Sequence, residues 1–417
     1  MVVDVCKKEN SLALQFIFMR RNPVLVLVAS LSCLVLCQSV CDKTKQQSII
    51  AANNPIITGA DQTEQYLSYL KGKRVAVLAN PTTIIGKRHL VDSLLSLGVN
   101  IVKVFGPEHG FRGNASAGVK VKDENDPATG VPVISLYGPK RKPTKEDLAN
   151  VDLMIFDIQD VGVRYYTYIS SMHYLLEAAA EQGVAVLVLD RPNPNGAYVD
   201  GPVLEQPFQS FVGMHPIPLL HGMTVGELAQ MIKGEGWINQ AATLQLTVIP
   251  VSHYQRNLPY TLPVKPSPNL PNAQAIALYP SLGFFEATPL SIGRGTAFPF
   301  QVIGYDKFAI GNFQFTPVST PGAAIAPPLM DKTVYGQDLR QTAAGGLNLS
   351  YLLQWHALFA QQNVRFFTAP GFMDKLAGTD KLRQQIEQGV SEQQIRHSWQ
   401  ADLVRFKQLR QPYLLYP

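Results

Sequence analysis

The sequence predicts an α/β fold, in which a mostly parallel sheet covered by helices is followed by a smaller α+β domain. Hydrophobic residues make up 46% and charged residues 16% of the 417 residues, which excludes an intrinsically disordered chain. Short, continuous apolar runs alternate with helical patterns through the first half, as parallel strands buried on both faces do. This alternation ends at a Pro-rich stretch, residues 258–271. The length favours two domains, of which the first is Rossmann-like.

The N-terminus has the pattern of a secretory signal. Arg20 and Arg21 precede an apolar run over residues 24–36, and small or polar residues follow it. The run is too short for a confident membrane-spanning helix. We therefore expect residues 1–41 to be a signal or export segment and the body to be periplasmic or extracellular. The true start could be Met1 or Met19.

All cysteines lie in this expected export segment, at Cys6, Cys33, Cys37 and Cys41. The body therefore has no disulfide framework, thiolate metal site or cysteine nucleophile. An uncleaved N-terminal anchor is an alternative to cleavage. A lipid anchor is disfavoured, because only Cys33 follows a small residue.

The elements expected in the body follow in order after a polar tether, residues 42–55. The expected strands cover residues 74–79, 100–105, 152–156, 184–189 and 244–251, and the expected helices cover residues 88–97, 167–182 and 224–233. Thr144 and Asp147 have the spacing of a helix capping box. The Pro-rich stretch excludes regular structure. Late helices are expected at 348–362, 380–389 and 391–409. Because the pattern changes after the Pro-rich stretch, the predicted domains are residues 56–274 (catalytic) and 275–417 (auxiliary).

Polar clusters follow three of the expected strands, at residues 105–113, 157–166 and 190–196. Ligands of open α/β sheets bind at the carboxyl ends of the strands, so these clusters should share one rim. Carboxylates in different surroundings on one rim are suited to general acid/base catalysis.

Each cluster also has a structural interpretation. Glycines on both sides of Glu108 favour function over simple capping. Asp157 and Asp160 could act in catalysis or bind amides at a helix N-terminus. Asp190 and Arg191 fit an ion pair that braces a loop better than a substrate contact.

Three aromatic residues shortly after an expected strand, Tyr165, Tyr166 and Tyr168, could stack on sugar rings or pack under the sheet. No G-x-G-x-x-G follows the first expected strand, and P-loop and G-x-S-x-G motifs are absent. The histidines lack metal-ligand spacing. We therefore expect no cofactor and no metal. The net charge of +5 is spread out, which argues against a nucleic-acid partner.

Several segments in the same order resemble the NamZ-type exo-β-N-acetylmuramidases, which are bacterial cell-wall glycosidases. They are residues 106–113, 157–168, 189–194, 267–271 and 293–296. The resemblance covers nearly the whole mature chain. It implies a Rossmann-like catalytic domain, a smaller C-terminal domain and a cleft between them. It also implies release of N-acetylmuramic acid from the non-reducing end of peptidoglycan fragments, in cell-wall turnover or recycling.

By this resemblance Glu108 would be the catalytic carboxyl, acting as general acid, with Tyr165 or Tyr166 assisting. The second catalytic group stays open between Asp157, Asp160 and the acetamido group of the substrate. The lactyl carboxylate of muramic acid needs a cation, for which the candidates are Arg112, Arg164 and Arg294. The remaining expected substrate-binding residues are His109, Tyr168, Asp190, Arg191 and Asn193.

One segment departs from the family pattern, because Glu286-Ala287-Thr288-Pro289 stands where the family usually has Glu-Gly-Thr-Asn. This departure supports an alternative, a non-catalytic protein that binds muramyl sugars on the same fold. An esterase or amidase ranks last, since the nucleophile motifs are missing. The expected partners are peptidoglycan-derived muramyl sugars, with membrane contact only through an N-terminal anchor. The sequence does not predict the oligomeric state.

Overall fold

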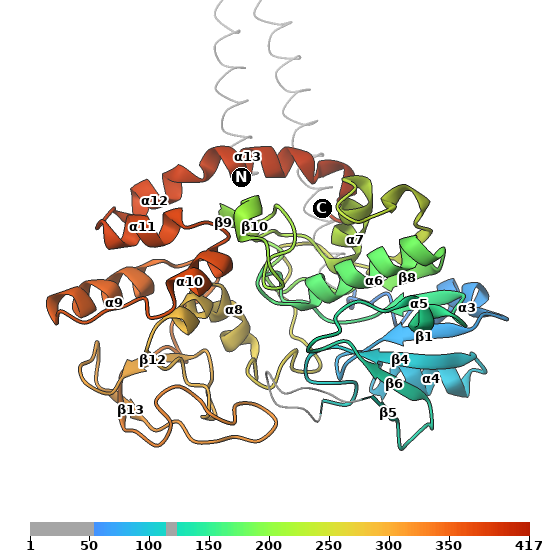
Figure 1. The fold of residues 1–417 in the computed structure, drawn as a ribbon, viewed down its shortest axis with the longest axis horizontal. Coiled ribbons are helices and arrows are strands. Elements are labelled where there is room, and N and C mark those ends of the chain that lie inside the picture. The colour runs from blue at the N-terminus through green and yellow to red at the C-terminus, as the bar shows by residue number, and fades with distance from the viewer. Residues whose placement is uncertain (1–53, 114–122) are drawn as a thin grey trace, which may run out of the picture. The chain divides into compact units, whose positions relative to one another are not determined.

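A seven-stranded sheet forms the first half of the body in the computed structural model, which describes residues 54–113 and 123–417. Its strands are, in spatial order, β11 (Leu246–Ile249), β8 (Ala185–Leu189), β7 (Leu153–Phe156), β1 (Val75–Leu78), β4 (Ile101–Gly106), β6 (Pro132–Ser135) and β5 (Glu124–Asn125). All neighbouring pairs are parallel except β5 with β6. The strand order reverses between β1 and β7, as in doubly wound folds. The predicted fold class is confirmed (Figure 1).

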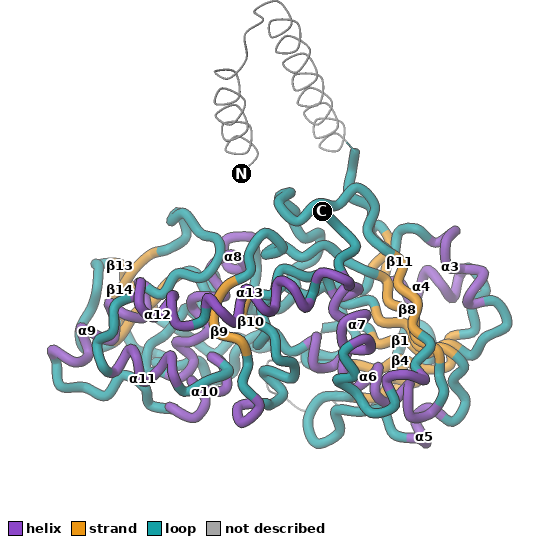
Figure 2. Tube along the Cα trace, turned by 90° about the horizontal axis from the view of Figure 1, so that it is seen from above, coloured by secondary structure: helices purple, strands orange, loops and turns teal. Residues whose placement is uncertain are grey.

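Alternate residues of the central strands enter two separate cores. Ala76 and Leu78 of β1 pack with α6 (Tyr168–Gln182) and α7 (Val225–Gly234). Val75 and Val77 pack with α3 (Thr63–Leu70) and α4 (Leu90–Ser96). Figure 2 shows the strands between these two helical layers. Burial on both faces explains the continuous apolar runs in the sequence.

Local signals set several helix ends. The predicted capping box of Thr144 and Asp147 is confirmed and begins α5 (Lys145–Leu148). Gly183 ends α6 in the left-handed conformation, which costs glycine little. The predicted helix 88–97 is shorter than expected, because Arg88 and His89 pair as β3 with β2 (Ile84–Ile85).

The C-terminal part contains a small antiparallel sheet and a set of helices. The sheet has the order β12 (Val302–Tyr305), β14 (Val334–Asp338) and β13 (Phe313–Phe315). The helices are α8 (Ala273–Leu282), α9 (Ser350–Gln361), α10 (Pro370–Ala377), α11 (Lys381–Glu387), α12 (Glu392–Ser398) and α13 (Gln400–Leu409). This composition confirms the predicted α+β class of the second part.

The predicted final helix is two helices. Trp399 ends α12 and precedes α13 with a non-helical backbone. Its buried indole donates a hydrogen bond to the carboxylate of Asp200, at 3.2 Å. Asp200 begins β9 (Asp200–Val203), which pairs with β10 (Pro218–Leu220). The tertiary bond of Trp399 therefore accompanies a break in a sequence that has continuous helical spacing.

Short 3-10 helices complete the body; they are η2 (Gln206–Phe208), η3 (Ala241–Thr243), η4 (Gly283–Ala287) and η5 (Gln411–Tyr413). The Pro-rich stretch 258–271 forms no helix or strand, as predicted. The predicted export segment lies outside the described residues. Within the described part of the chain, no helix is long and apolar enough to cross a membrane.

Three consecutive side chains join the two parts of the body. The fully buried guanidinium of Arg164 donates to the carbonyls of Pro202 and Ile217 and to those of Leu376 and Ala377 at the end of α10, at 2.6–3.1 Å. Tyr165 donates to the carbonyls of Tyr279 and Pro280, and Tyr166 donates to that of Pro266. One continuous apolar core also runs through both parts. Burial lowers the pKa of Arg164 to about 9.

We expect Arg164→Met to lower the free energy of unfolding by at least about 3 kcal/mol, because four buried carbonyls lose their donor. Urea denaturation measures the change. Arg405→Met is the matched control, since its side chain is 71% exposed, and its effect should stay within about 0.5 kcal/mol. Equal unfolding midpoints for the two variants would contradict the role of Arg164.

Candidate active site

A cavity of about 310 Å³ is lined by residues from both parts of the body. The α/β part contributes residues after β4, β6 and β7, including Glu108, Tyr137, Arg141 and Tyr165 to Tyr168. The Pro-rich stretch contributes Ser267, Asn269 and Leu270, and the C-terminal part contributes Tyr279, Glu286, Arg294, Phe300, Phe372 and Leu376. The volume is at the lower end of the range for small-molecule sites.

Glu108 stands in a tight turn directly after β4. The turn closes with a hydrogen bond from the Gly110 amide to the Pro107 carbonyl, at 2.9 Å. His109 and Gly110 both have positive φ, 69° and 75°. A left-handed conformation is costly for a histidine, and such strain is found preferentially at functional sites. The glycine that the sequence analysis singled out therefore allows the turn that carries Glu108.

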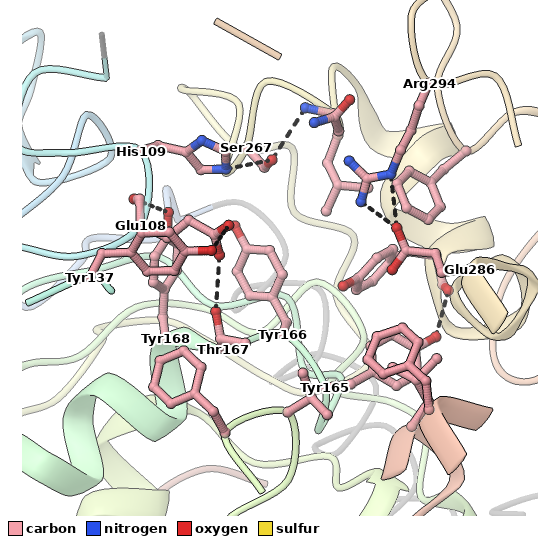
Figure 3. Close-up of a pocket in the computed structure, with 18 of the residues that line it drawn as sticks. Glu108, His109, Tyr137, Tyr165, Tyr166, Thr167, Tyr168, Ser267, Glu286 and Arg294 are labelled. Carbon is pink, nitrogen blue, oxygen red and sulfur yellow. Dashed lines mark hydrogen bonds and ion pairs between the residues drawn. The ribbon is translucent and has the colours of Figure 1, made fainter. Parts of the chain in front are cut away.

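The half-buried carboxylate of Glu108 is held by two hydroxyl groups. Tyr137 donates to Oε1 at 2.8 Å, and Thr167 donates a longer bond to Oε2 at 3.5 Å (Figure 3). Tyr168 donates to the backbone carbonyl of Glu108. Tyr137 was missed by the sequence analysis. It lies two residues after β6, the strand that pairs with β4, and this adjacency was the only available signal.

The predicted tyrosines line the cavity, but the hydroxyl groups of two of them already donate hydrogen bonds to backbone carbonyls. Tyr165 and Tyr166 donate to the backbone carbonyls described above. Burial raises the pKa of both phenols well above the usual value, so both are neutral. Since a neutral phenol has one proton to donate, both side chains offer the cavity mainly their ring surfaces.

A second carboxylate lines the cavity at Glu286, in η4. Arg294 donates to its Oε1 through Nε at 2.8 Å and through Nη2 at 2.5 Å. The guanidinium of Arg294 also lies 4.9 Å from the ring centroid of Phe300. Figure 3 shows this pair on the opposite side of the cavity from Glu108. The pocket therefore combines two carboxylates with different partners.

His109 also lines the cavity, with Nε2 at 3.5 Å from the hydroxyl of Ser267. Ser267 in turn accepts the amide of Asn269. The Pro-rich stretch is thus fastened to the turn of Glu108, which explains how an irregular segment can form one wall.

The segment that departs from the family pattern, residues 286–289, contributes only its first residue to the cavity lining. Glu286 lines the cavity, and Ala287, Thr288 and Pro289 lie outside the lining. The carbonyl of Ala287 accepts the amides of Thr368 and Ala369. The replaced glycine and asparagine positions therefore lie next to the site and not at its surface.

The structure does not bring the remaining predicted residues to the cavity. These are Asp157, Asp160, Asp190, Arg191, Asn193, Arg112 and Arg164. Asp157 and Arg191 form a buried bidentate ion pair at 2.6 and 2.8 Å. Arg112 pairs with Asp92 and Asp126.

Asp190 and Asn193 organise loops. Asp190 accepts the hydroxyl groups of Thr224 and Tyr416 and the amide of Gly226, and so holds the N-terminus of α7. Burial raises its pKa to about 6. Asn193 donates to the carbonyl of Met223. The expected ion pair between Asp190 and Arg191 is wrong, because the Arg191 guanidinium pairs with Asp157 and Asp190 accepts the backbone amide of Arg191. Asp190 still braces a loop, as expected.

The crevice at the strand-order reversal is filled by the chain itself. Thr83, after β1, donates its hydroxyl to the Asp157 carbonyl after β7, and Thr82 accepts the Gln159 amide. A dinucleotide-binding protein keeps this place open for phosphates. Here the ligand cavity lies beside it, beyond the ends of β4 and β7.

The comparisons with known proteins agree in one family. Residues 75–274 match the family described as exo-beta-N-acetylmuramidase NamZ, N-terminal, and residues 277–416 match its C-terminal counterpart. The chain belongs to the NamZ family. It is 40% identical over 382 residues to the peptidoglycan beta-N-acetylmuramidase NamZ of Bacillus subtilis (strain 168), which covers 86% of this chain and 91% of that protein.

Two crystal structures from Bacteroides fragilis NCTC 9343, titled as DUF1343 family proteins, have the same fold as this NamZ-family chain. One is 46% identical with a TM-score of 0.80, and the other is 31% identical with a TM-score of 0.74. Each alignment covers 87% of this chain and 99% of the other. The predicted resemblance is therefore confirmed.

Asp160 is a buried carboxyl outside the cavity lining that should make the stability depend on pH. It is 4% exposed, its Oδ2 accepts the Gly162 amide, and its Oδ1 has no partner among the described residues. Burial raises its pKa to about 7, above the ordinary 3.8. The folded state therefore keeps this proton longer than the unfolded state does. The stability that it contributes is present below about pH 4 and is lost as the pH rises to about 7.

We expect Asp160→Asn to remove this pH dependence, which should amount to a few kcal/mol between pH 4 and pH 7. Thermal or urea unfolding at successive pH values measures it. The exposed Asp331→Asn is the control and should keep the wild-type slope. An unchanged slope in Asp160→Asn would show that another group causes the pH dependence.

Proposed function

We propose that this protein is an exo-acting β-N-acetylmuramidase that releases N-acetylmuramic acid from the non-reducing end of peptidoglycan fragments. The observation that carries the proposal is the carboxyl of Glu108, held by Tyr137 at the wall of a cavity in a NamZ-family chain. The 40% identity to the Bacillus subtilis enzyme supports the same reaction.

Glu108 acts as the general acid in this proposal. We assign the transferred proton to Oε2, because Oε1 accepts the shorter bond, from Tyr137, and the bond to Oε2 from Thr167 is longer. Oε2 then donates that proton to the glycosidic oxygen while the sugar develops oxocarbenium character. The weak bond from Thr167 to Oε2 is long enough to give way to a bound substrate.

Glu286 is the second carboxylate that we propose for the reaction, in place of Asp157 and Asp160. It lines the same cavity and faces Glu108 across it, whereas both aspartates lie outside the lining. Its pairing with Arg294 supplies a counter-charge. Glu286 can stabilise the oxocarbenium ion, activate water or attack directly, and the anomeric configuration of the product distinguishes inversion from retention.

Export of the chain is part of the proposal. Its support is the basic and apolar pattern of the first 41 residues, and peptidoglycan itself lies outside the cytoplasmic membrane. The alternative of a non-catalytic binding protein rested on the altered segment after Glu286. Since Ala287 and Pro289 lie outside the cavity lining, that segment no longer favours it.

We expect Glu108→Gln to reduce turnover of a muramyl-N-acetylglucosamine disaccharide by about 10²- to 10⁴-fold, because the glutamine has no proton to give. Quantified release of N-acetylmuramic acid measures this. A substrate with a nitrophenolate leaving group should lose much less, since that group departs without protonation. Glu286→Gln should impair both substrates, because its role concerns the sugar cation.

The exposed Glu64→Gln is the matched control and should retain wild-type rates on both substrates. Near wild-type turnover of the disaccharide by Glu108→Gln would remove Glu108 from the acid role. Equal losses on both substrates would show that Glu108 acts on the sugar and not on the leaving group.

A further inference from the structure

A basic run after β6 contains one exposed arginine, Arg141, that lines the cavity. Lys140 pairs with Asp147 at 3.4 Å, and Lys142 pairs with Glu177 and Glu181 at 2.8 and 2.7 Å. Arg141, between them, has neither an ion pair nor a hydrogen bond within residues 54–113 and 123–417. Within the described residues, both neighbouring lysines thus have carboxylate partners, and Arg141 has none.

An aromatic stack positions the guanidinium of Arg141. Its Cζ lies 4.1 Å from the ring centroid of Phe211, which also lines the cavity. The ring of Phe211 in turn stacks on the ring of Tyr174, with the centroids 6.3 Å apart and an angle of 13° between the ring planes. Stacking uses the face of the guanidinium and leaves its edge of N–H donors for a ligand.

The charges of the cavity lining point to an anionic ligand group for this edge. The lining contains two arginines, Arg141 and Arg294. Arg294 donates hydrogen bonds from Nε and Nη2 to Glu286. The carboxylates of Glu108 and Glu286 would repel an anionic ligand group unless a positively charged side chain of the protein lay next to that group. Arg141 is the lining arginine that has no carboxylate partner in the described part of the chain.

We propose that Arg141, stacked on Phe211, is a carboxylate-binding subsite that determines specificity for the muramyl substrate. This inference rests on the proposed function. A planar guanidinium edge matches a carboxylate with two parallel hydrogen bonds. The carboxylate can come from the lactyl group of the sugar or from an attached peptide stem. A stem converts the lactyl carboxylate into an amide, so the two sources can be separated.

The test compares three disaccharides that differ only at the lactyl group: the free acid, its methylamide, and a form carrying a dipeptide stem. For Arg141→Met we expect kcat/KM on the free acid to fall about 10- to 100-fold, as for loss of a charge-assisted hydrogen bond. The methylamide should change less than about twofold. Arg141→Lys should have an intermediate kcat/KM on the free acid, since lysine keeps the positive charge and loses the pair of parallel N–H donors.

Lys140→Met is the matched control and should match wild type on all three substrates, because Lys140 is ion-paired and lies outside the cavity lining. A loss confined to the stem-bearing substrate would assign the subsite to the carboxylates of the stem. Equal losses on all three substrates would overturn the proposal.

Calorimetric binding separates this inference from the proposed function. Wild-type protein should bind N-acetylmuramic acid more tightly than its methylamide, and Arg141→Met should abolish that difference, even if no substrate is cleaved. Binding without cleavage would overturn the glycosidase proposal alone. Equal binding of the acid and the amide by wild type would overturn the subsite.

Discussion

Three adjacent side chains, Arg164, Tyr165 and Tyr166, determine how the cavity is assembled. Each leaves the loop after β7 and donates to backbone carbonyls far away in the sequence. Backbone carbonyls are acceptors that no substitution removes, and a buried donor that lost them would be costly. These bonds fix α8, α10 and the Pro-rich stretch against the end of the sheet. The wall that carries Glu286 therefore holds a defined position opposite Glu108.

The same packing limits which side chains the site can use. An atom placed at the Cβ position of Gly283 would lie 2.4 Å from the hydroxyl oxygen of Tyr165, so glycine is required where η4 begins. Glu108 occupies a turn with positive φ at His109, and a hydroxyl of the neighbouring strand's loop orients its carboxylate. Rigid backbone contacts thus surround a carboxyl that keeps access to the cavity. Such preorganisation is what general acid catalysis requires.

Apolar periodicity was sufficient to predict β1, β4, β7, β8, β11 and the long helix α6, because burial on both faces leaves a local signal. It missed the parallel strand β6, which begins with Pro132 and is not buried at every residue. It did not reveal α8 and α10, which carry prolines at Pro280 and Pro370, or the short antiparallel sheet. In the site, Glu108 follows its own strand and was found. Tyr137 and Arg141 depend on the pairing of β6 with β4, and Glu286 depends on the Tyr165 contacts. Those are tertiary relations that spacing along the chain does not encode.

The position of a bound substrate tests the account most directly. A crystal structure of Glu108→Gln with an uncleaved muramyl-terminated disaccharide should place the glycosidic oxygen within about 3.2 Å of the side chain at position 108. The muramyl ring should then lie between that side chain and Glu286. A disaccharide bound outside this cavity, or one whose glycosidic oxygen lies next to a different acid, would contradict the account.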